Sequence, residues 1–200
     1  HFLEISKDTN LVTTAYGNTF SRNWQKLDKV GGVNISRAIM DMSAGGGYDI
    51  INGEAAGTLK VKDNNRTYYL YGIQSNLTHK LKWGETDHKI DIGIRYHYDQ
   101  IRRLQASDTY TQDANGYITS ATSTMYGKDG NRLQYTHATS LNISDQIKFK
   151  KLTFTPGIRA ENIDATYIKY NEDDNGDHIQ KITTHTGQNY GMIAGGASLK

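Results

Sequence analysis

The side chains in this chain that are suited to holding a ligand are mostly guanidinium groups. Arginine offers a planar fork of N–H donors, which fits a carboxylate or a phosphate in a bidentate manner. We expect the ligand-binding side chains among a small set near the predicted strands and their loop-side ends. The set is Arg66, Arg95, His97, Arg102, Arg103 and Gln134. These groups suit a ligand that is rich in carboxylate or phosphate.

Patterns typical of catalysis or metal binding are not found in the sequence. Without cysteine, the chain has no thiol nucleophile and no thiolate metal ligand. Its seven histidines form no H-x-H or H-x-x-x-H pair. The acidic stretch 171–177 matches only part of a calcium loop, because Ile182 stands where the bidentate glutamate is required. We therefore predict no enzymatic activity, no cofactor and no metal site.

Composition narrows the class of protein further. The 200 residues include 23 Lys and Arg against 21 Asp and Glu, which gives a net charge of +2. A balance so close to neutral predicts no nucleic-acid partner. Mean hydropathy is −0.69, and no run of about 18 apolar residues occurs, which excludes a transmembrane helix. The 14 tyrosines and the regular patterning exclude disorder.

The elements that must position the candidate residues are β-strands. In residues 89–98 the even positions are Ile, Ile, Ile, Tyr and Tyr, whereas the odd positions are Lys, Asp, Gly, Arg and His. Alternation of this kind predicts a strand with one apolar and one wet face. Residues 69–83 alternate in the same way, and the polar residues 84–87 predict a hairpin turn between them. Further strands are predicted at about 11–24, 133–144, 152–161 and 188–200.

The predicted connections are unequal in length. Short turns at about 7–10, 84–87 and 146–151 alternate with long polar stretches at about 26–64, 103–131 and 171–186. The first long stretch has room for a short helix near 36–42. Short turns at one end and long loops at the other are typical of outer-membrane β-barrels. If the apolar face meets lipid, the wet face with Arg95, His97 and Gln134 looks into the lumen.

Aromatic residues stand near both ends of the apolar face. Tyr71 and Trp83 lie 12 positions apart on the same face, which corresponds to roughly 28–30 Å along the axis of a tilted-strand barrel. An apolar band of about 25 Å is flanked by aromatic girdles in such barrels. We predict girdle positions for Tyr69, Tyr71, Tyr96 and Tyr98 on the loop side and for Trp83 on the turn side. The alternative interpretation is cross-strand aromatic pairing on a soluble sandwich.

Four ordered segments resemble the barrel of TonB-dependent receptors. They are residues 65–75 (NRTYYLYGIQS), 88–97 (HKIDIGIRYH), 144–147 (SDQI) and 152–159 (LTFTPGIR). The likeness is closest to the ferric-citrate-transporter-like branch and covers about 65–170. No single segment is specific, whereas their order and spacing are.

The resemblance implies a fold and a role. It implies an all-β, antiparallel up-and-down segment of a transmembrane β-barrel, with about six to seven strands of a 22-stranded barrel. Residues 1–200 would be a partial barrel domain, with the plug domain and the C-terminal strands absent. The whole receptor would sit in the bacterial outer membrane, contact its lipid, and import a ferric chelate such as ferric citrate. Energy would come from the TonB complex through the missing plug region. Arg66 and Arg95 lie in the matched segments.

Two alternatives belong to other classes of protein. One is a passive outer-membrane barrel, such as a porin or an adhesin, and a plug domain upstream would decide against it. The other is a soluble all-β module, for example one that binds carbohydrate, which would be soluble without detergent.

Overall fold

The chain forms one antiparallel β-sheet with two short helices in a loop. The computed structural model describes residues 1–171 and 181–200. The strands are β1 (Phe2–Ser6), β2 (Thr9–Val30), β3 (Val33–Asn34), β4 (Gly57–Trp83), β5 (Thr86–Gln112), β6 (Ile118–Ser123), β7 (Gly130–Phe149), β8 (Leu152–Asn171) and β9 (Lys181–Leu199). The helices are α1 (Ile35–Ala38) and α2 (Gly47–Asn52). Neither of these described helices has the length and apolar character needed to cross a membrane.

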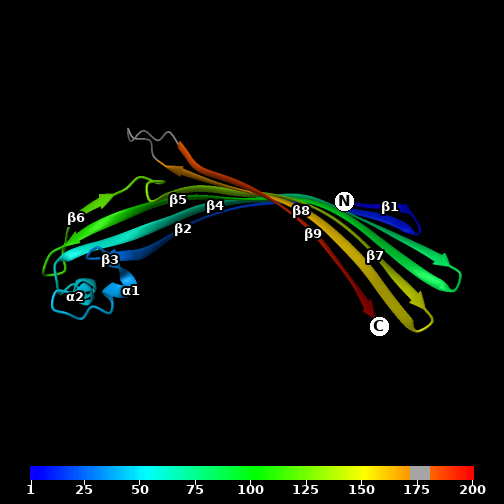
Figure 1. Ribbon diagram of the computed structural model, residues 1–200, viewed down its shortest axis with the longest axis horizontal. Helices are drawn as coiled ribbons and strands as arrows, with labels where there is room; N and C mark the ends of the chain where they lie inside the picture. Colours follow the sequence, from blue (N-terminus) through cyan, green and yellow to red (C-terminus); the bar gives the residue numbers. More distant parts are fainter. Residues whose placement is uncertain (172–180) are drawn as a thin grey trace.

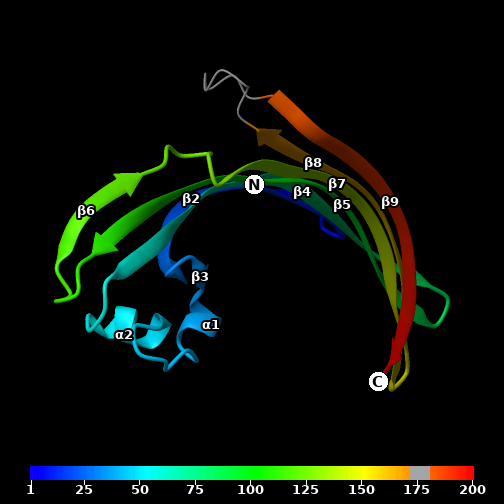
Figure 2. The ribbon, with the colours of Figure 1, turned by 60° about the vertical axis from the view of Figure 1, so that its left-hand side comes forward.

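Strands that follow one another in the chain are neighbours in the sheet. The order is β1-β2-β4-β5-β7-β8-β9, with β3 paired to β2 and β6 paired to β5. Every pairing is antiparallel, and the sheet bends into an arch (Figures 1 and 2). This is the predicted up-and-down arrangement, so the fold class is confirmed.

The two ends of the sheet differ as predicted. At one end, two-residue turns join β1 to β2, β4 to β5 and β7 to β8. Gly84 and Lys150 in these turns adopt the left-handed region, at φ 59° and 55°. The connections 31–56 and 113–129 lie at the other end, with α1, α2 and β6 in them (Figure 1). We call these ends the turn side and the loop side.

The strands extend farther to the loop side than the sequence predicted. Strand β4 begins at Gly57 and β5 ends at Gln112, so parts of the predicted loops 26–64 and 103–131 are paired strand. Likewise β9 begins at Lys181 and not near 188. Both faces of β4 and β5 are largely polar in the extension, so the alternation that identifies a half-apolar strand is lost there. Backbone pairing, which has no sequence signature of its own, continues through it.

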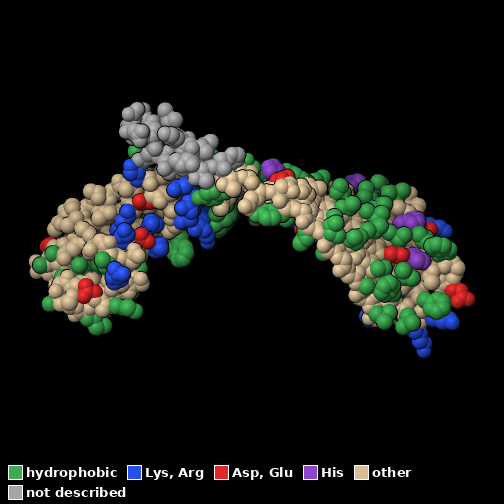
Figure 3. All heavy atoms as spheres, viewed as in Figure 1, with side chains coloured by type: hydrophobic (Ala, Val, Ile, Leu, Met, Phe, Trp, Pro, Cys, Tyr) green, Lys and Arg blue, Asp and Glu red, His purple; other side chains and the backbone are tan. Residues whose placement is uncertain are grey.

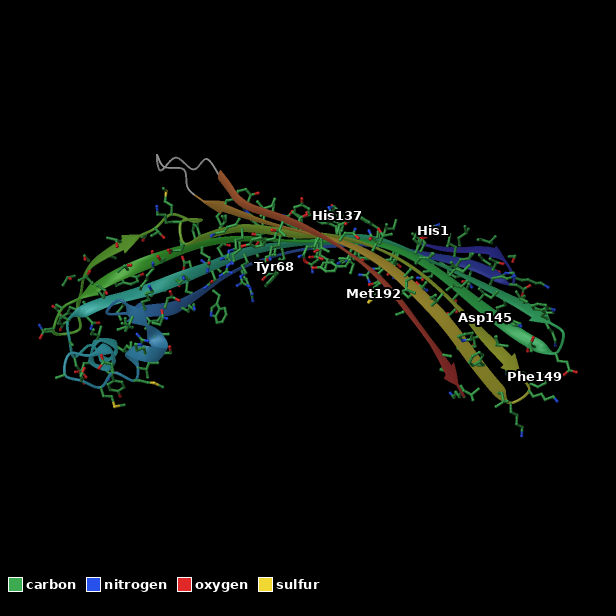
Figure 4. The ribbon with its side chains drawn as sticks, in the orientation of Figure 1. His1, Tyr68, His137, Asp145, Phe149 and Met192 are labelled. Carbon is green, nitrogen blue, oxygen red and sulfur yellow. The ribbon has the colours of Figure 1, made fainter. Side chains whose placement is uncertain are left out.

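The register assigns each side chain to one of two faces. Tyr71 pairs with Tyr98, and Tyr98 pairs with His137, so these three share what we call the apolar face. Their neighbours along each strand point to the polar face. Figure 4 places Tyr68, from the polar face, on the concave side of the arch and His137 on the convex side. The concave side of a sheet that closes into a barrel is the lumen side.

Little of the sheet is covered by a core. In the described chain the buried apolar cluster comprises Val30, Ala38 and Ile50, where α1 and α2 pack against the loop-side ends of β2 and β4. Gly47 permits this packing, because a Cβ there would lie 2.6 Å from the Ala38 Cα. By contrast, Ile94 on the apolar face is 56% exposed. Figure 3 shows many hydrophobic side chains on the surface of the turn-side half, as a lipid-facing barrel requires.

Pro156 lies inside strand β8, which continues on either side of it. The pairings Ser144–Gly157 and Ile147–Phe154 keep one register on either side of it. The pairing between β7 and β8 is simply interrupted opposite Pro156, which has no N–H to donate.

Candidate ligand-binding site

The register divides the predicted ligand-binding residues between two levels of the sheet. Arg66 pairs with Arg103, whereas Arg95 pairs with Gln74. Positions 66 and 74 of β4 are eight residues apart (74 − 66), which corresponds to about 26 Å along the strand. Arg66 and Arg95 therefore cannot contact the same small ligand.

The loop-side level contains Arg66 and Arg103 on the polar face. Arg103 pairs in turn with Arg132 on β7. The Nε atoms of Arg66, Arg103 and Arg132 are buried and have no hydrogen-bond partner. Gln134 lies two residues farther along β7 on the same face, opposite Ile101. This level thus combines clustered guanidinium groups with an adjacent amide.

Arg102 is separated from the other candidates by the alternation of the strand. It pairs with Leu133, and its guanidinium carbon lies 4.8 Å from the centre of the Tyr170 ring, on the apolar face. Consecutive residues of a strand point to opposite faces. Arg102 and Arg103 therefore cannot both face the lumen, and the structure places only Arg103 there.

The mid-strand level is a hydrogen-bonded cluster around a tyrosine. Arg95 Nε donates to the Tyr16 hydroxyl oxygen at 2.9 Å, and the same hydroxyl lies 2.9 Å from His97 Nδ1. The Tyr16 ring fits over Gly72, whose missing Cβ leaves the space. Beside this cluster, Arg159 forms an ion pair with Glu161 and donates to the Ser140 hydroxyl at 3.1 Å. Most hydrogen-bonding capacity here is already used within the protein.

Ion pairing differs between the lysines and the arginines on the loop side. Lys26 and Lys62 each lie 3.2 Å from a carboxylate oxygen of Asp28, and Lys60 lies 3.5 Å from Asp129 Oδ1. No comparable carboxylate partner is found for Arg66, Arg103 or Arg132 within the described ranges 1–171 and 181–200. Carboxylates thus neutralise the lysines of this region, whereas in the described chain they do not neutralise these three arginines.

The connection between α1 and α2 is held by an acidic side chain. Asp41 accepts a hydrogen bond from the Ser43 hydroxyl at 2.5 Å and another from the Ser43 backbone N–H at 3.3 Å. These donors favour the charged carboxylate and hold the pKa of Asp41 below its ordinary value.

The predicted girdle tyrosines lie together on the apolar face. The Tyr71 and Tyr98 rings stack with their centres 4.6 Å apart, and the Tyr96 hydroxyl lies 2.8 Å from His137 Nδ1. Tyr69 lies on this face two residues loop-side of Tyr71. Trp83 is 76% exposed at the end of β4, next to the turn. The tyrosines lie farther toward the loop side than Trp83 does, and their role as membrane girdles stays a prediction.

Acidic and histidine side chains do not converge on a metal site in the part of the chain that the structure describes. The half-matched calcium loop at 171–177 falls mostly outside the described residues.

Sequence reasoning missed several members of both levels. Arg22, Arg132 and Lys169 belong to the loop-side level, and Tyr16 belongs to the mid-strand level. Only the pairing register brings these residues together, and one sequence does not reveal it.

Comparison with solved structures identifies the fold. No family model and no curated protein matches the chain. The ferric citrate transporter FecA, in its unliganded form, matches 99% of this chain with a TM-score of 0.64 at 16% identity. The ferric-catecholate import receptor Fiu from E. coli K12 matches 99% at 12% identity, with TM-scores of 0.65 for its open and 0.58 for its closed form.

These structural neighbours are much longer than the chain. The chain spans 23% of the FecA chain and 31% or 28% of the two Fiu chains. Both neighbours are transport proteins or receptors, and neither is an enzyme. The chain has the fold of a segment of the β-barrel found in these receptors.

Proposed function

We propose that the chain is part of an outer-membrane receptor that imports a ferric chelate with energy supplied through TonB. The fold supports this role, because FecA and Fiu, which share it, handle ferric citrate and ferric catecholate respectively. The observation that carries the proposal is the group of arginines on the polar face whose Nε atoms have no hydrogen-bond partner, at the loop side of the barrel segment. A chelate that enters from the loops meets this group first.

The cargo that fits this group is an anionic chelate, with ferric citrate or a similar carboxylate complex as the leading candidate. Arg66 and Arg103 offer bidentate forks to carboxylates, and Gln134 offers an amide beside them. Arg95 and His97, about 20–26 Å farther toward the turn side, would meet the chelate later on its path. Arg102 has no part in binding the chelate, because it lies on the other face.

The remaining partners follow from the two faces. Lipid would cover the apolar face, with the tyrosines near Tyr71 and Tyr98 at one boundary and Trp83 at the other. The plug domain and the TonB complex would act from parts of the receptor that lie outside this chain.

Uptake of radioactive ferric citrate by cells tests this proposal. We expect uptake to require the full-length protein and to stop when TonB is deleted or the proton gradient is collapsed. Energy-independent uptake would instead identify a passive barrel. Arg66→Ala should reduce uptake at low substrate concentration, whereas Arg102→Ala should not. If Arg66→Ala and Arg95→Ala both leave uptake unchanged, these residues have no part in the site.

A further inference from the structure

Five strands each place a cation at the same level of the polar face. Arg22 on β2 pairs with Arg66 on β4, which pairs with Arg103 on β5. Arg103 pairs with Arg132 on β7, which pairs with Lys169 on β8. We call these five residues the cationic row. At a strand spacing of about 4.8 Å, the row is about 19 Å long.

The cationic row is unfavourable for the sheet by itself. Like charges directly opposite each other on neighbouring strands destabilise a sheet, and the row contains four such pairs in succession. Among the described residues, the nearby carboxylates of Asp28 and Asp129 do not relieve the repulsion at its centre, because lysines engage them. Three guanidinium Nε atoms, of Arg66, Arg103 and Arg132, are left without an acceptor. The charge at the centre of the row therefore has no carboxylate counterpart among the described residues.

The surroundings of the row also suit a ligand. Tyr68 lies on its turn side, with the Arg22 guanidinium carbon 5.7 Å from the ring centre. The Phe20 and Tyr68 ring centres are 5.9 Å apart. Trp24, on the loop side of the row, is 62% exposed. Figure 3 shows Lys and Arg side chains gathered on this half of the molecule.

We propose that the cationic row binds a multivalent oxyanion, a single molecule that carries several carboxylate or phosphate groups. The row recognises the oxyanion groups themselves, so a metal-free polyanion also binds. A ligand with one oxyanion group engages one or two arginines, whereas one with three engages neighbouring strands together. The inference rests on the proposed function in one respect, namely that the polar face lines an accessible lumen. It assigns Arg22, Arg132 and Lys169 to the site together with Arg66 and Arg103.

Calorimetric titration of the full-length protein in detergent tests the site. The probes are inorganic phosphate, tripolyphosphate and metal-free citrate at equal ionic strength. We expect tripolyphosphate to bind at least about tenfold more tightly than phosphate, and citrate to show whether carboxylates serve as well. Arg103→Gln should weaken tripolyphosphate binding by about 10- to 100-fold, the range for a lost charged hydrogen bond.

The chain offers a matched control at the next position. Arg102→Gln removes the same charge from the same strand, but on the apolar face, and should change the affinity less than about twofold. Without ligand, Arg103→Gln should leave the melting temperature unchanged or raise it, because it relieves repulsion. This measurement also shows that the variant is folded.

Three results would overturn the proposal: no binding of tripolyphosphate or citrate to the unmodified protein, equal weakening by Arg102→Gln and Arg103→Gln, or equal affinity for phosphate and tripolyphosphate. Ferric citrate uptake is scored separately. Polyanion binding that depends on Arg103, in cells that take up no ferric chelate, would leave the row standing and reject the proposed function. TonB-dependent uptake without polyanion binding would support the proposed function and reject the cationic row as a polyanion site.

Discussion

Gly72 controls the geometry of the mid-strand cluster, and replacing it with alanine should disrupt that cluster. Gly72 pairs with Tyr16 on one side and with His97 on the other. An alanine Cβ would overlap the phenol of Tyr16 and would lie 2.7 Å from the Tyr96 carbonyl oxygen. The carbonyl belongs to the backbone of β5 and cannot move away, so Tyr16 must. Its hydroxyl then leaves both Arg95 Nε and His97 Nδ1.

The change in the free energy of unfolding on Gly72→Ala combines two destabilising effects and one stabilising effect. Overpacking costs about 1–3 kcal/mol. The lost hydrogen bonds cost about 1 kcal/mol for the neutral one and about 1.5 kcal/mol or more for the one from the guanidinium group. Because these groups are only half-buried, water replaces part of this. Alanine regains about 0.5–1 kcal/mol of strand preference over glycine. The net expectation is a loss of about 2–4 kcal/mol in the free energy of unfolding.

Urea unfolding of the full-length protein in detergent, followed by circular dichroism, measures this loss. Gly17→Ala is the matched control, because its Cβ would lie 3.8 Å from the Leu70 carbonyl oxygen, an ordinary contact. It should change stability by less than about 1 kcal/mol. In a Tyr16→Ala background, Gly72→Ala should cost less, since the ring is gone and only the contact with the Tyr96 carbonyl oxygen remains. If Gly72→Ala proves as harmless as Gly17→Ala, the assigned packing is wrong.

Three further predictions concern the loops and the apolar face. Gln112→Ala removes two hydrogen bonds, of 2.8 and 2.9 Å, to carbonyl oxygens in and after α2; it should cost about 1–3 kcal/mol locally, seen as faster hydrogen exchange over residues 47–55. Hydrogen bonds from Ser43 hold the pKa of Asp41 down in the folded protein. The charged carboxylate therefore stabilises the loop fully above its unfolded-state pKa of about 4. This stabilisation is lost as the pH falls below that value and through the lower folded-state pKa. An NMR titration that gives Asp41 an ordinary or raised pKa would contradict this. A double-mutant cycle between Tyr71→Ala and Tyr98→Ala should give a coupling of about 0.5–1.5 kcal/mol from their stacking, and a coupling near zero would argue against the stack.

The sequence was informative wherever one face of a strand is apolar. Residues 89–98 alternate cleanly, and the structure places them in β5 with Ile92, Ile94 and Tyr96 on the apolar face. The turn at 84–87 and the grouping of long connections at one end were also predicted correctly. These features depend on local residue types, which a single sequence displays directly.

The loop-side extension of the strands could not be predicted, because this alternation is missing there. In β4, residues 57–68 place polar and charged side chains on both faces, for example Lys62 next to Asp63. A strand with polar side chains on both faces shows no alternation, and backbone pairing with its neighbours holds it in place. Polar composition therefore predicted a loop where the chain forms paired strand.

The candidate site shows why ranking residues singly was insufficient. Arg66 and Arg95 both lie in conspicuous segments, yet the register places them at different levels of the sheet. Arg22 was not among the predicted residues, although it pairs with Arg66, which lies 44 positions (66 − 22) later in the sequence. A single arginine on a barrel wall is ordinarily matched by a carboxylate from a neighbouring strand. Among the described residues, Arg66, Arg103 and Arg132 have no such carboxylate, and like charges opposite one another lower the stability of the unliganded sheet. Bound anions would offset that cost. A substitution that removes one of these arginines should therefore weaken anion binding and raise the stability of the unliganded protein.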